Sequence, residues 1–243
     1  MPTDIPLIEI EGLATDYGAG EWIAPHAHDA HQIIHAGTGV MRVVSDAASW
    51  VVPPGRAIWM PAGQVHAIRC HTAVAMRTVY LRGRAPALPA ATAVWAVSPL
   101  MREIAIRIAT TPKPRGCDHL LALLLFEIET IATMPMVLPQ PSDARLRRMT
   151  EAITADPADQ RPLKSWARLL GMSERSLIRA FLVETGMTFR QWRRQARLLV
   201  ALERLAAGEA VTAVAFAVGY DSTSAFIAAF RETFGETPRR YFG

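Results

Sequence analysis

Histidines are concentrated in one short stretch of the chain: five of the seven lie between residues 26 and 66. Imidazole nitrogen binds zinc, nickel, iron and copper, so this concentration makes coordination of a first-row divalent ion chemically reasonable. His26 and His28 are separated by one residue. On a strand the two side chains would point to the same face, because alternate residues of a strand share a face.

A second group of reactive side chains combines arginine and serine on one predicted helical face. Leu177 and Phe181 are four residues apart and point inward in a helix. The opposite face then carries Arg175, Ser176 and Arg179. Arginine can donate two parallel hydrogen bonds to guanine, serine can bond bases or phosphates, and such a helix fits the major groove. The predicted chemistry is recognition of double-stranded DNA.

The elements that must position these side chains occur twice in the sequence. SERSLIRAFLVETGMTF begins at Ser173, and STSAFIAAFRETFGETP begins at Ser222, 49 residues later. Just upstream, Gly171 and Gly219 pair at an offset of 48. Each unit is interpreted as a short helix, a turn at the glycine, and a second helix capped by the serine. A duplicated helix-turn-helix unit is therefore predicted.

The two units differ in the side chains that their second helices expose. The second unit would expose Ser222, Thr223, Ser224 and Ala228, which offer little for reading bases. We therefore expect the first unit to supply most sequence discrimination. The second unit is expected to contribute phosphate contacts, positioning and shape readout.

A long helix between the units carries an arginine face, and a capping box at Thr188 and Gln191 opens it. Its arginines lie at i, i+3, i+4 and i+7: Arg190, Arg193, Arg194 and Arg197. Three interpretations stay open for each of them: a phosphate contact, a solvated basic face, or a side chain folded back to support a turn. Arg194 and Lys164, which lies in the first helix of the first unit, complete the predicted DNA-contacting set.

Residues 144 to 243 resemble the AraC/XylS-type DNA-binding domain. The resemblance rests on GMSERSLIRAF, ETGMTFRQW, VAFAVGYDSTSAF and FGETPRRYF. It implies seven helices, with two helix-turn-helix units that face successive major grooves. The partner it implies is promoter or operator DNA, together with RNA polymerase if the protein activates transcription.

The N-terminal half has short β-like runs from residue 5 to about 81, separated by proline and glycine turns, which suggests a barrel or sandwich. Two motifs there resemble those of cupins, which are small jelly-roll barrels. The first is formed by Gly20, His26, His28, Gln32 and Gly39. The second is formed by Gly55, Pro61, Gly63 and His66.

The cupin resemblance implies a ligand set of His26, His28, Gln32 and His66. Gln32 stands where metal-binding cupins have a glutamate, and its neutral amide should bind metal more weakly. By strand parity, an effector pocket would include Ile34, Ile68 and Cys70. Two possibilities remain: these histidines hold a divalent Zn, Ni, Fe or Cu ion, or they line a pocket for an organic effector without metal.

The domain prediction is a cupin-like sensor domain at residues 1–85, a helical linker and dimerisation segment at 86–141, and an all-α DNA-binding domain at 142–243. The fold class is α+β and multidomain. Residues 83–97 are expected to form a Pro/Ala connector, and residues 134–143 an interdomain linker. Charge agrees with this division, because residues 1–141 carry a net −1 and residues 142–243 carry +5.

Composition limits the class of protein further. Apolar residues make up 51% of the chain and charged residues 20%, as in soluble globular proteins. Cys70 and Cys117 provide no disulfide framework, as expected for a reducing compartment. The first residues lack the features of a secretory signal, and the longest apolar run, 120–126, is far shorter than the roughly 20 residues that span a bilayer. We expect a cytoplasmic protein with no membrane partner.

The leading hypothesis is a ligand-responsive transcription regulator without enzymatic activity, in which a small molecule or metal in the barrel controls DNA binding. Homodimerisation is expected through helices at 98–110 and 118–133. Their apolar stripe is Leu121, Leu124, Leu125 and Ile128, for which packing within the chain is the alternative. Two other functions were weighed: a metal-dependent cupin enzyme with a DNA-binding appendage, and a purely architectural DNA binder, which leaves the histidines unexplained.

Overall fold

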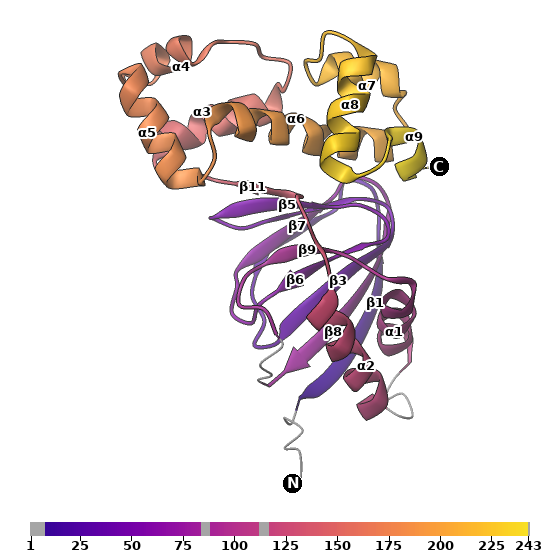
Figure 1. Cartoon of the computed structure of the whole chain (residues 1–243). Coiled ribbons are helices and arrows are strands. Elements are labelled where there is room, and N and C mark those ends of the chain that lie inside the picture. The colour runs from indigo at the N-terminus through magenta and orange to yellow at the C-terminus, as the bar shows by residue number, and fades with distance from the viewer. Residues whose placement is uncertain (1–7, 84–87, 112–116, 243) are drawn as a thin grey trace. The chain divides into compact units, whose positions relative to one another are not determined.

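The computed structural model describes residues 8–83, 88–111 and 117–242 of the chain. The chain forms two compact units, and Figure 1 shows strands dominating the first and helices the second. The first unit comprises Met1–Ser45 and Trp50–Met136, and the second comprises Asp46–Ser49 and Val137–Gly243. The helices of the expected middle segment, 86–141, therefore belong to the first unit.

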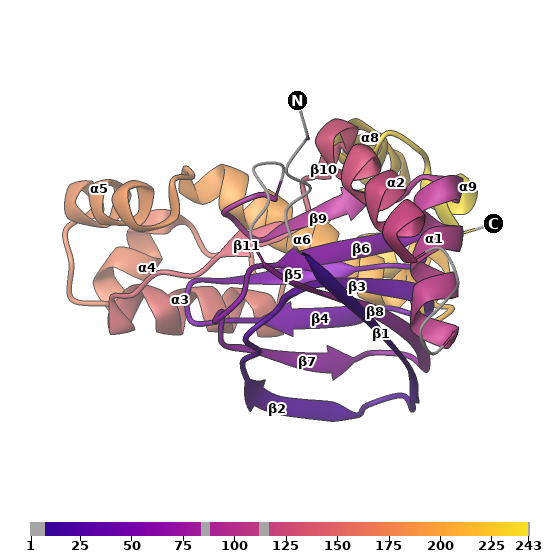
Figure 2. The ribbon, with the colours of Figure 1, turned by 90° about the horizontal axis from the view of Figure 1, so that it is seen from below.

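The first unit is a sandwich of two antiparallel sheets. One sheet has the order β1-β8-β3-β6-β9-β10, and the other includes β5-β4-β7-β2, of which Figure 2 shows β4, β7 and β2 side by side. The strands of the chain, of which β11 lies in the second unit, are β1 Glu9–Tyr17, β2 Trp22–His26, β3 His31–Thr38, β4 Met41–Val44, β5 Ala48–Val52, β6 Arg56–Met60, β7 His66–Cys70, β8 Val74–Arg82, β9 Ala93–Ala96, β10 Thr133–Met134 and β11 Val137–Pro139.

Strand β3 is buried on both of its faces, which explains its nearly continuous apolar sequence. Ile33 lies in a core with residues of two helices, α1 (Pro99–Thr110) and α2 (Cys117–Thr130), whereas Gln32 and Ile34 are buried on the opposite face. His35 shares the parity of Ile33 and is completely buried. Its Nδ1 contacts the Arg56 carbonyl at 3.0 Å, so it is a packing residue rather than a surface one.

Helices α1, Pro99–Thr110, and α2, Cys117–Thr130, cover one face of the larger sheet. Ser98 caps α1 by accepting a hydrogen bond from the Met101 amide, and Pro99 opens the helix, as the sequence predicts. The predicted dimerisation stripe is largely buried in this core: Leu121, Leu124 and Ile128 are 7%, 0% and 4% exposed. That stripe packs within the chain, which was the alternative interpretation.

The second unit contains seven helices within its described residues. They are α3 Ala144–Ala155, α4 Leu163–Leu169, α5 Glu174–Thr185, α6 Phe189–Ala206, α7 Val211–Ala217, α8 Thr223–Phe234 and α9 Pro238–Phe242. Their apolar faces meet around large buried side chains, including Trp166, Phe181, Trp192, Phe226 and Phe230. The long helix α6 connects the pair α4–α5 to the pair α7–α8 (Figure 1).

The expected connector and the expected linker both contain short strands. Residues 83–97 contain β9, which pairs with β6, and residues 134–143 contain the end of β10 and all of β11. Part of the first connector, 84–87, lies outside the described residues. These strands are two to four residues long, and their pairing partners are distant in sequence, so local patterns do not reveal them.

Candidate functional site

The first helix-turn-helix unit presents its polar face to solvent. Ser173 caps α5 by accepting a hydrogen bond from the Ser176 amide at 3.1 Å, so the helix begins where the sequence predicts. Leu177 and Phe181 are 0% and 1% exposed, and they hold α5 against the rest of the unit. Five side chains of this helix-turn-helix unit that are predicted to contact DNA are exposed: Lys164, Ser173, Arg175, Ser176 and Arg179.

The second helix-turn-helix unit repeats this geometry with smaller side chains. The turn before α8 has Gly219 at φ +82°, and Ser222 caps the helix by accepting from the Ala225 amide at 3.2 Å. Phe226 and Phe230 are buried, which turns the opposite face outward. Ser222, Ser224 and Ala228 are exposed, and Thr223 is partly exposed. The surface offers hydroxyl and methyl groups but no long base-reading side chain at these positions.

The arginine face of α6 mostly makes contacts inside the helical unit of the chain, residues 137–243. Arg194 donates two hydrogen bonds to the Glu232 carboxylate, at 2.6 and 3.2 Å, and this ion pair raises the pKa of the guanidinium. Arg193 donates to the Arg161 carbonyl at 3.2 Å, and Arg197 donates to the Pro157 carbonyl at 2.8 Å. These three arginines thus support turns and helices of the helical unit. The guanidinium of Arg194 could reach a phosphate only by giving up this pairing with Glu232.

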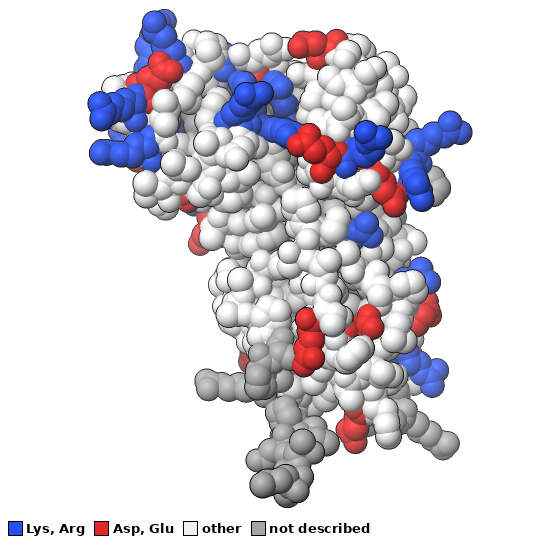
Figure 3. All heavy atoms as spheres, viewed as in Figure 1, with Lys and Arg blue, Asp and Glu red and all other residues white. Residues whose placement is uncertain are grey.

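Positive charge nevertheless gathers on the end of this unit that carries α4 and α5. Figure 3 shows lysine and arginine side chains projecting there. Exposed basic residues of these two helices are Lys164, Arg168, Arg175 and Arg179. Side chains of this type attract the phosphates of nucleic acid regardless of base sequence.

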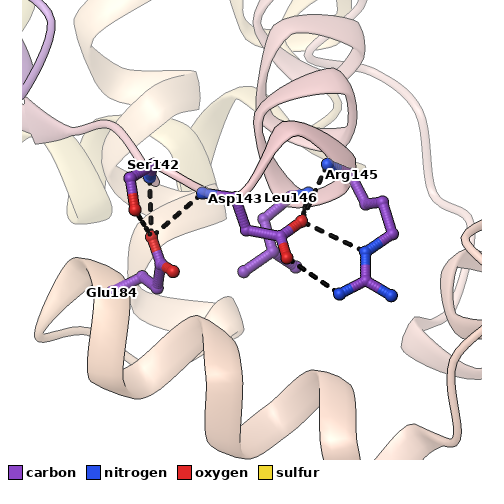
Figure 4. A network of polar contacts seen from close by, with 5 residues as sticks. All are labelled: Ser142, Asp143, Arg145, Leu146 and Glu184. Carbon is purple, nitrogen blue, oxygen red and sulfur yellow. Dashed lines mark hydrogen bonds and ion pairs between the residues drawn. The ribbon is translucent and has the colours of Figure 1, made fainter.

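A carboxylate network attaches the start of α3 to the end of α5 (Figure 4). Glu184 accepts hydrogen bonds from the Ser142 amide and hydroxyl, at 2.6 and 2.7 Å, and from the Asp143 amide at 3.2 Å. Asp143 in turn caps α3 and pairs with Arg145, which lowers the pKa of its carboxyl to about 2. Helix α5 is thus anchored near its C-terminal end.

In the β-sandwich unit, three histidines converge as the cupin resemblance implies. His26 ends β2, His66 begins β7, and His28 follows β2 in the loop before β3. The sheet pairing places His26 opposite His66, and one nitrogen of each of the three rings lies within 4.8 Å of the others. A tetrahedral ion with bonds of about 2.0–2.1 Å would need nitrogens roughly 3.4 Å apart, so the three rings would have to draw closer together to bind one.

The histidine rings are oriented in a way that suits metal coordination. The Nδ1 atoms of His26 and His66 lie 2.8 and 2.9 Å from the backbone carbonyls of Ala24 and Gln64, which leaves each Nε2 for another partner. His66 is 1% exposed, and its Nε2 has no hydrogen-bond partner in the described structure. Burial lowers the pKa of His66, which favours the neutral ring that binds metal.

Gln32, the fourth predicted ligand, is buried and has a partner that the sequence did not reveal. It lies opposite Tyr80 in the β3–β8 pairing, and the Gln32 side chain partly offsets the rise in the pKa of Tyr80 that burial causes. The Tyr80 ring also meets His28 edge-on, with ring centres 5.3 Å apart. Tyr80 thus lies next to both His28 and Gln32.

The predicted effector-pocket residues lie in the tightly packed interior. Ile34, Ile68 and Cys70 are 1%, 2% and 0% exposed, and burial raises the pKa of the Cys70 thiol. Tyr80, His26 and His28 are partly exposed, so they are the members of this region within reach of a molecule arriving from solvent. The position of Tyr80 depends on the register of β3 and β8, which no local sequence pattern reveals.

Both units are similar to known proteins. Residues 10–126 match the family described as AraC-like ligand binding domain, and residues 166–243 match a helix-turn-helix domain family. The HTH-type transcriptional regulator NimR of Escherichia coli K12 is 35% identical over 229 residues, which cover 92% of this chain and 84% of NimR. The regulator RipA of Corynebacterium glutamicum is 37% identical over 103 residues, 42% of this chain and 31% of RipA.

Among solved structures, ToxT from Vibrio cholerae aligns over 96% of this chain and 97% of its own, with 10% identity and a TM-score of 0.42. No helix in the described ranges combines the length and apolar character needed to cross a bilayer.

Proposed function

The chain belongs to the AraC family of DNA-binding transcription regulators with an N-terminal ligand-binding domain. From this premise we propose which residues read DNA and what the β-sandwich unit binds. The base-reading surface is the exposed face of α5, formed by Arg175, Ser176 and Arg179. The observation that carries this assignment is the burial of Leu177 and Phe181, which turns both arginines outward on a capped helix.

The second helix-turn-helix unit supports DNA binding in this proposal. Ser222, Thr223 and Ser224 donate to phosphates at the start of α8, where the helix dipole also favours anions. Lys164 adds a phosphate contact from α4, and Arg194 mainly holds α8 through Glu232. A contact with RNA polymerase belongs to the proposal if the protein activates transcription.

Replacement of single arginines tests the assignment of α5. Arg175→Ala and Arg179→Ala should each weaken binding to the selected operator by about 1–3 kcal/mol and relax base preference at one position. Arg148→Ala on α3 is the matched control, because it removes an exposed arginine that lies outside both helix-turn-helix units. Unchanged operator selectivity in both α5 variants would count against the assignment.

For the β-sandwich unit we propose a divalent transition ion held by His26, His28 and His66. Support comes from the convergence of the three rings, the carbonyl contacts of two Nδ1 atoms, and the buried Nε2 of His66 without a partner. A bound ion would supply the positive charge and the coordination bonds that draw the imidazoles together. The Tyr80 ring lies beside His28, so an effector that bound next to such an ion would meet this ring.

Metal content can be measured directly on the purified full chain. Elemental analysis and native mass spectrometry should find about one zinc, nickel, iron or copper ion per chain. His66→Ala should lose it, whereas His119→Ala, a change at an exposed histidine of α2, should keep it. A metal-free wild-type protein that still binds an organic effector would show that the histidines line an ordinary pocket.

The same proposal covers assembly and cellular role. A homodimer would use apolar side chains that α1 and α2 leave exposed: Leu100, Leu123 and Phe126 are 48%, 43% and 61% exposed. A regulatory rather than enzymatic role is favoured because the curated relatives are transcription regulators. A cytoplasmic location follows from a chromosomal DNA partner.

A further inference from the structure

One arginine of α6 touches the segments that support both helix-turn-helix units. Arg197 donates from Nε to the Pro157 carbonyl, at 2.8 Å, in the segment between α3 and α4. Its guanidinium also lies against Gly219, in the turn between α7 and α8: a Cβ placed on this glycine would lie 2.8 Å from an Arg197 nitrogen. Arg197 therefore stands at a junction between the first and the second unit.

Backbone from both units also meets directly at this junction. The same Cβ position on Gly219 lies 2.9 Å from the Cα of Ala158. Glycine is needed at this point twice over, because its φ is +82° and because no side chain fits against Ala158. The close approach leaves little freedom for the turn of the second unit to slide along the segment that precedes the first.

Neighbouring arginines of α6 hold each unit separately. Arg193 donates to the carbonyl of Arg161, two residues before α4, and Arg194 pairs with Glu232 on α8. Arg197 differs from both because it contacts the segment before α4 and the turn between α7 and α8 at once. Partial burial lowers its pKa, and a charged donor in such a place is costly to leave without its acceptor.

We propose that Arg197 is a positioning residue that fixes the distance and rotation between the two recognition helices, so that the chain prefers one spacing between its two half-sites on DNA. This inference rests on the proposed DNA-binding role of α5 and α8. One added base pair moves a half-site by about 3.4 Å along the duplex and rotates it by about 35°. A rigid junction resists this displacement, and a loosened junction tolerates it.

The probe is duplex DNA selected from random sequence by the wild-type full chain, which identifies the two half-sites. Binding is then measured on the selected duplex, on duplexes with one base pair added or removed between the half-sites, and on a duplex with the first half-site alone. The variants are Arg197→Met, which keeps length and removes the donor, and Arg197→Lys, which keeps charge. Arg190→Met is the control, because Arg190 is exposed on the same helix.

Wild type should bind the selected spacing at least about tenfold more tightly than either altered spacing. Arg197→Met should reduce this preference by about tenfold, as expected for loss of a charge-assisted hydrogen bond, with half-site binding unchanged. Arg197→Lys should lie between the two, and Arg190→Met should keep the preference. An unchanged preference in Arg197→Met overturns the inference, and so does loss of half-site binding, since Arg197 would then maintain the first unit itself.

Failure of the proposed function has a different signature from failure of this inference. If selection by the wild-type chain yields no two-part sequence, the assignment of α5 and α8 to DNA fails, and the spacing inference falls with it. If selection succeeds and the spacing preference ignores Arg197, the function stands and only the role of the junction is refuted.

Discussion

Two glycines at equivalent places of the repeat should respond very differently to alanine. Gly171 and Gly219 each end a turn with positive φ, +64° and +82°. Around Gly171 a Cβ would meet nothing within 4 Å, whereas at Gly219 it would lie 2.8 Å from Arg197 and 2.9 Å from the Cα of Ala158. Both substitutions pay the cost of a left-handed alanine, about 1–2 kcal/mol.

Gly219→Ala should cost a further ~1–3 kcal/mol for overpacking. The Arg197 guanidinium could move aside only by abandoning the Pro157 carbonyl, and the Ala158 backbone cannot move without shifting the segment before α4. For a unit of about 100 residues, 1 kcal/mol corresponds to roughly 4–8 °C in Tm. The melting temperature of the helical unit in Gly219→Ala should therefore lie at least about 4 °C below that of Gly171→Ala.

Thermal unfolding of the full chain, followed by circular dichroism at 222 nm and by calorimetry, measures this difference. Gly186→Ala is a second control, because this glycine also has positive φ and open surroundings. Equal destabilisation by all three substitutions would refute the argument, since it would show that the close approach at Gly219 carries no energetic weight.

Three other predictions concern caps, pH and assembly. Thr188→Ala should destabilise the helical unit by about 1 kcal/mol, because Thr188 and Gln191 form a complete capping box on α6; urea denaturation measures this. The pKa of Asp143 is lowered to about 2, so the stability that its carboxylate adds is present above the unfolded-state pKa of about 3.9 and is lost as pH falls toward 2. The stability difference between wild type and Asp143→Asn should accordingly shrink over that interval, and a difference independent of pH would contradict the role of the charge. Phe126→Glu should weaken self-association in sedimentation experiments without lowering Tm, because this ring is 61% exposed on α2; a variant that unfolds instead would place the ring in the core.

Local signals in the sequence predicted the helical unit well. Ser173, Ser222 and the pair Thr188–Gln191 cap the helices as predicted, because a cap depends on residues three positions apart. The glycine turns follow for the same reason, since positive φ is a property of single residues. The repeat offset then placed both units without any knowledge of distant contacts.

Contacts between distant residues could not be predicted in this way. The spacing of the α6 arginines indicated a common face, but the partner of Arg194 is Glu232, 38 residues away, and that of Arg197 is Pro157, 40 residues away. Likewise the Gln32–Tyr80 pair depends on the register of two strands. Gaps of this size are closed by tertiary packing, which periodicity does not encode.

The histidine group illustrates the intermediate case. Spacing brought His26 and His28 together, but His66 joined them through the resemblance to cupin motifs, and the sheet pairing then set it opposite His26. What the sequence could not foresee is the orientation of the rings, with two Nδ1 atoms on carbonyls and one buried Nε2 without a partner.

Methylation interference at guanine N7 on the selected duplex tests most directly whether α5 and α8 enter DNA together. Because N7 lies in the major groove, methylated guanines should block binding where a recognition helix sits. We predict two clusters of blocking positions on one face of the duplex, about 10 base pairs apart, with the stronger cluster under α5. A single cluster, or blocking positions scattered around the duplex, would contradict the account.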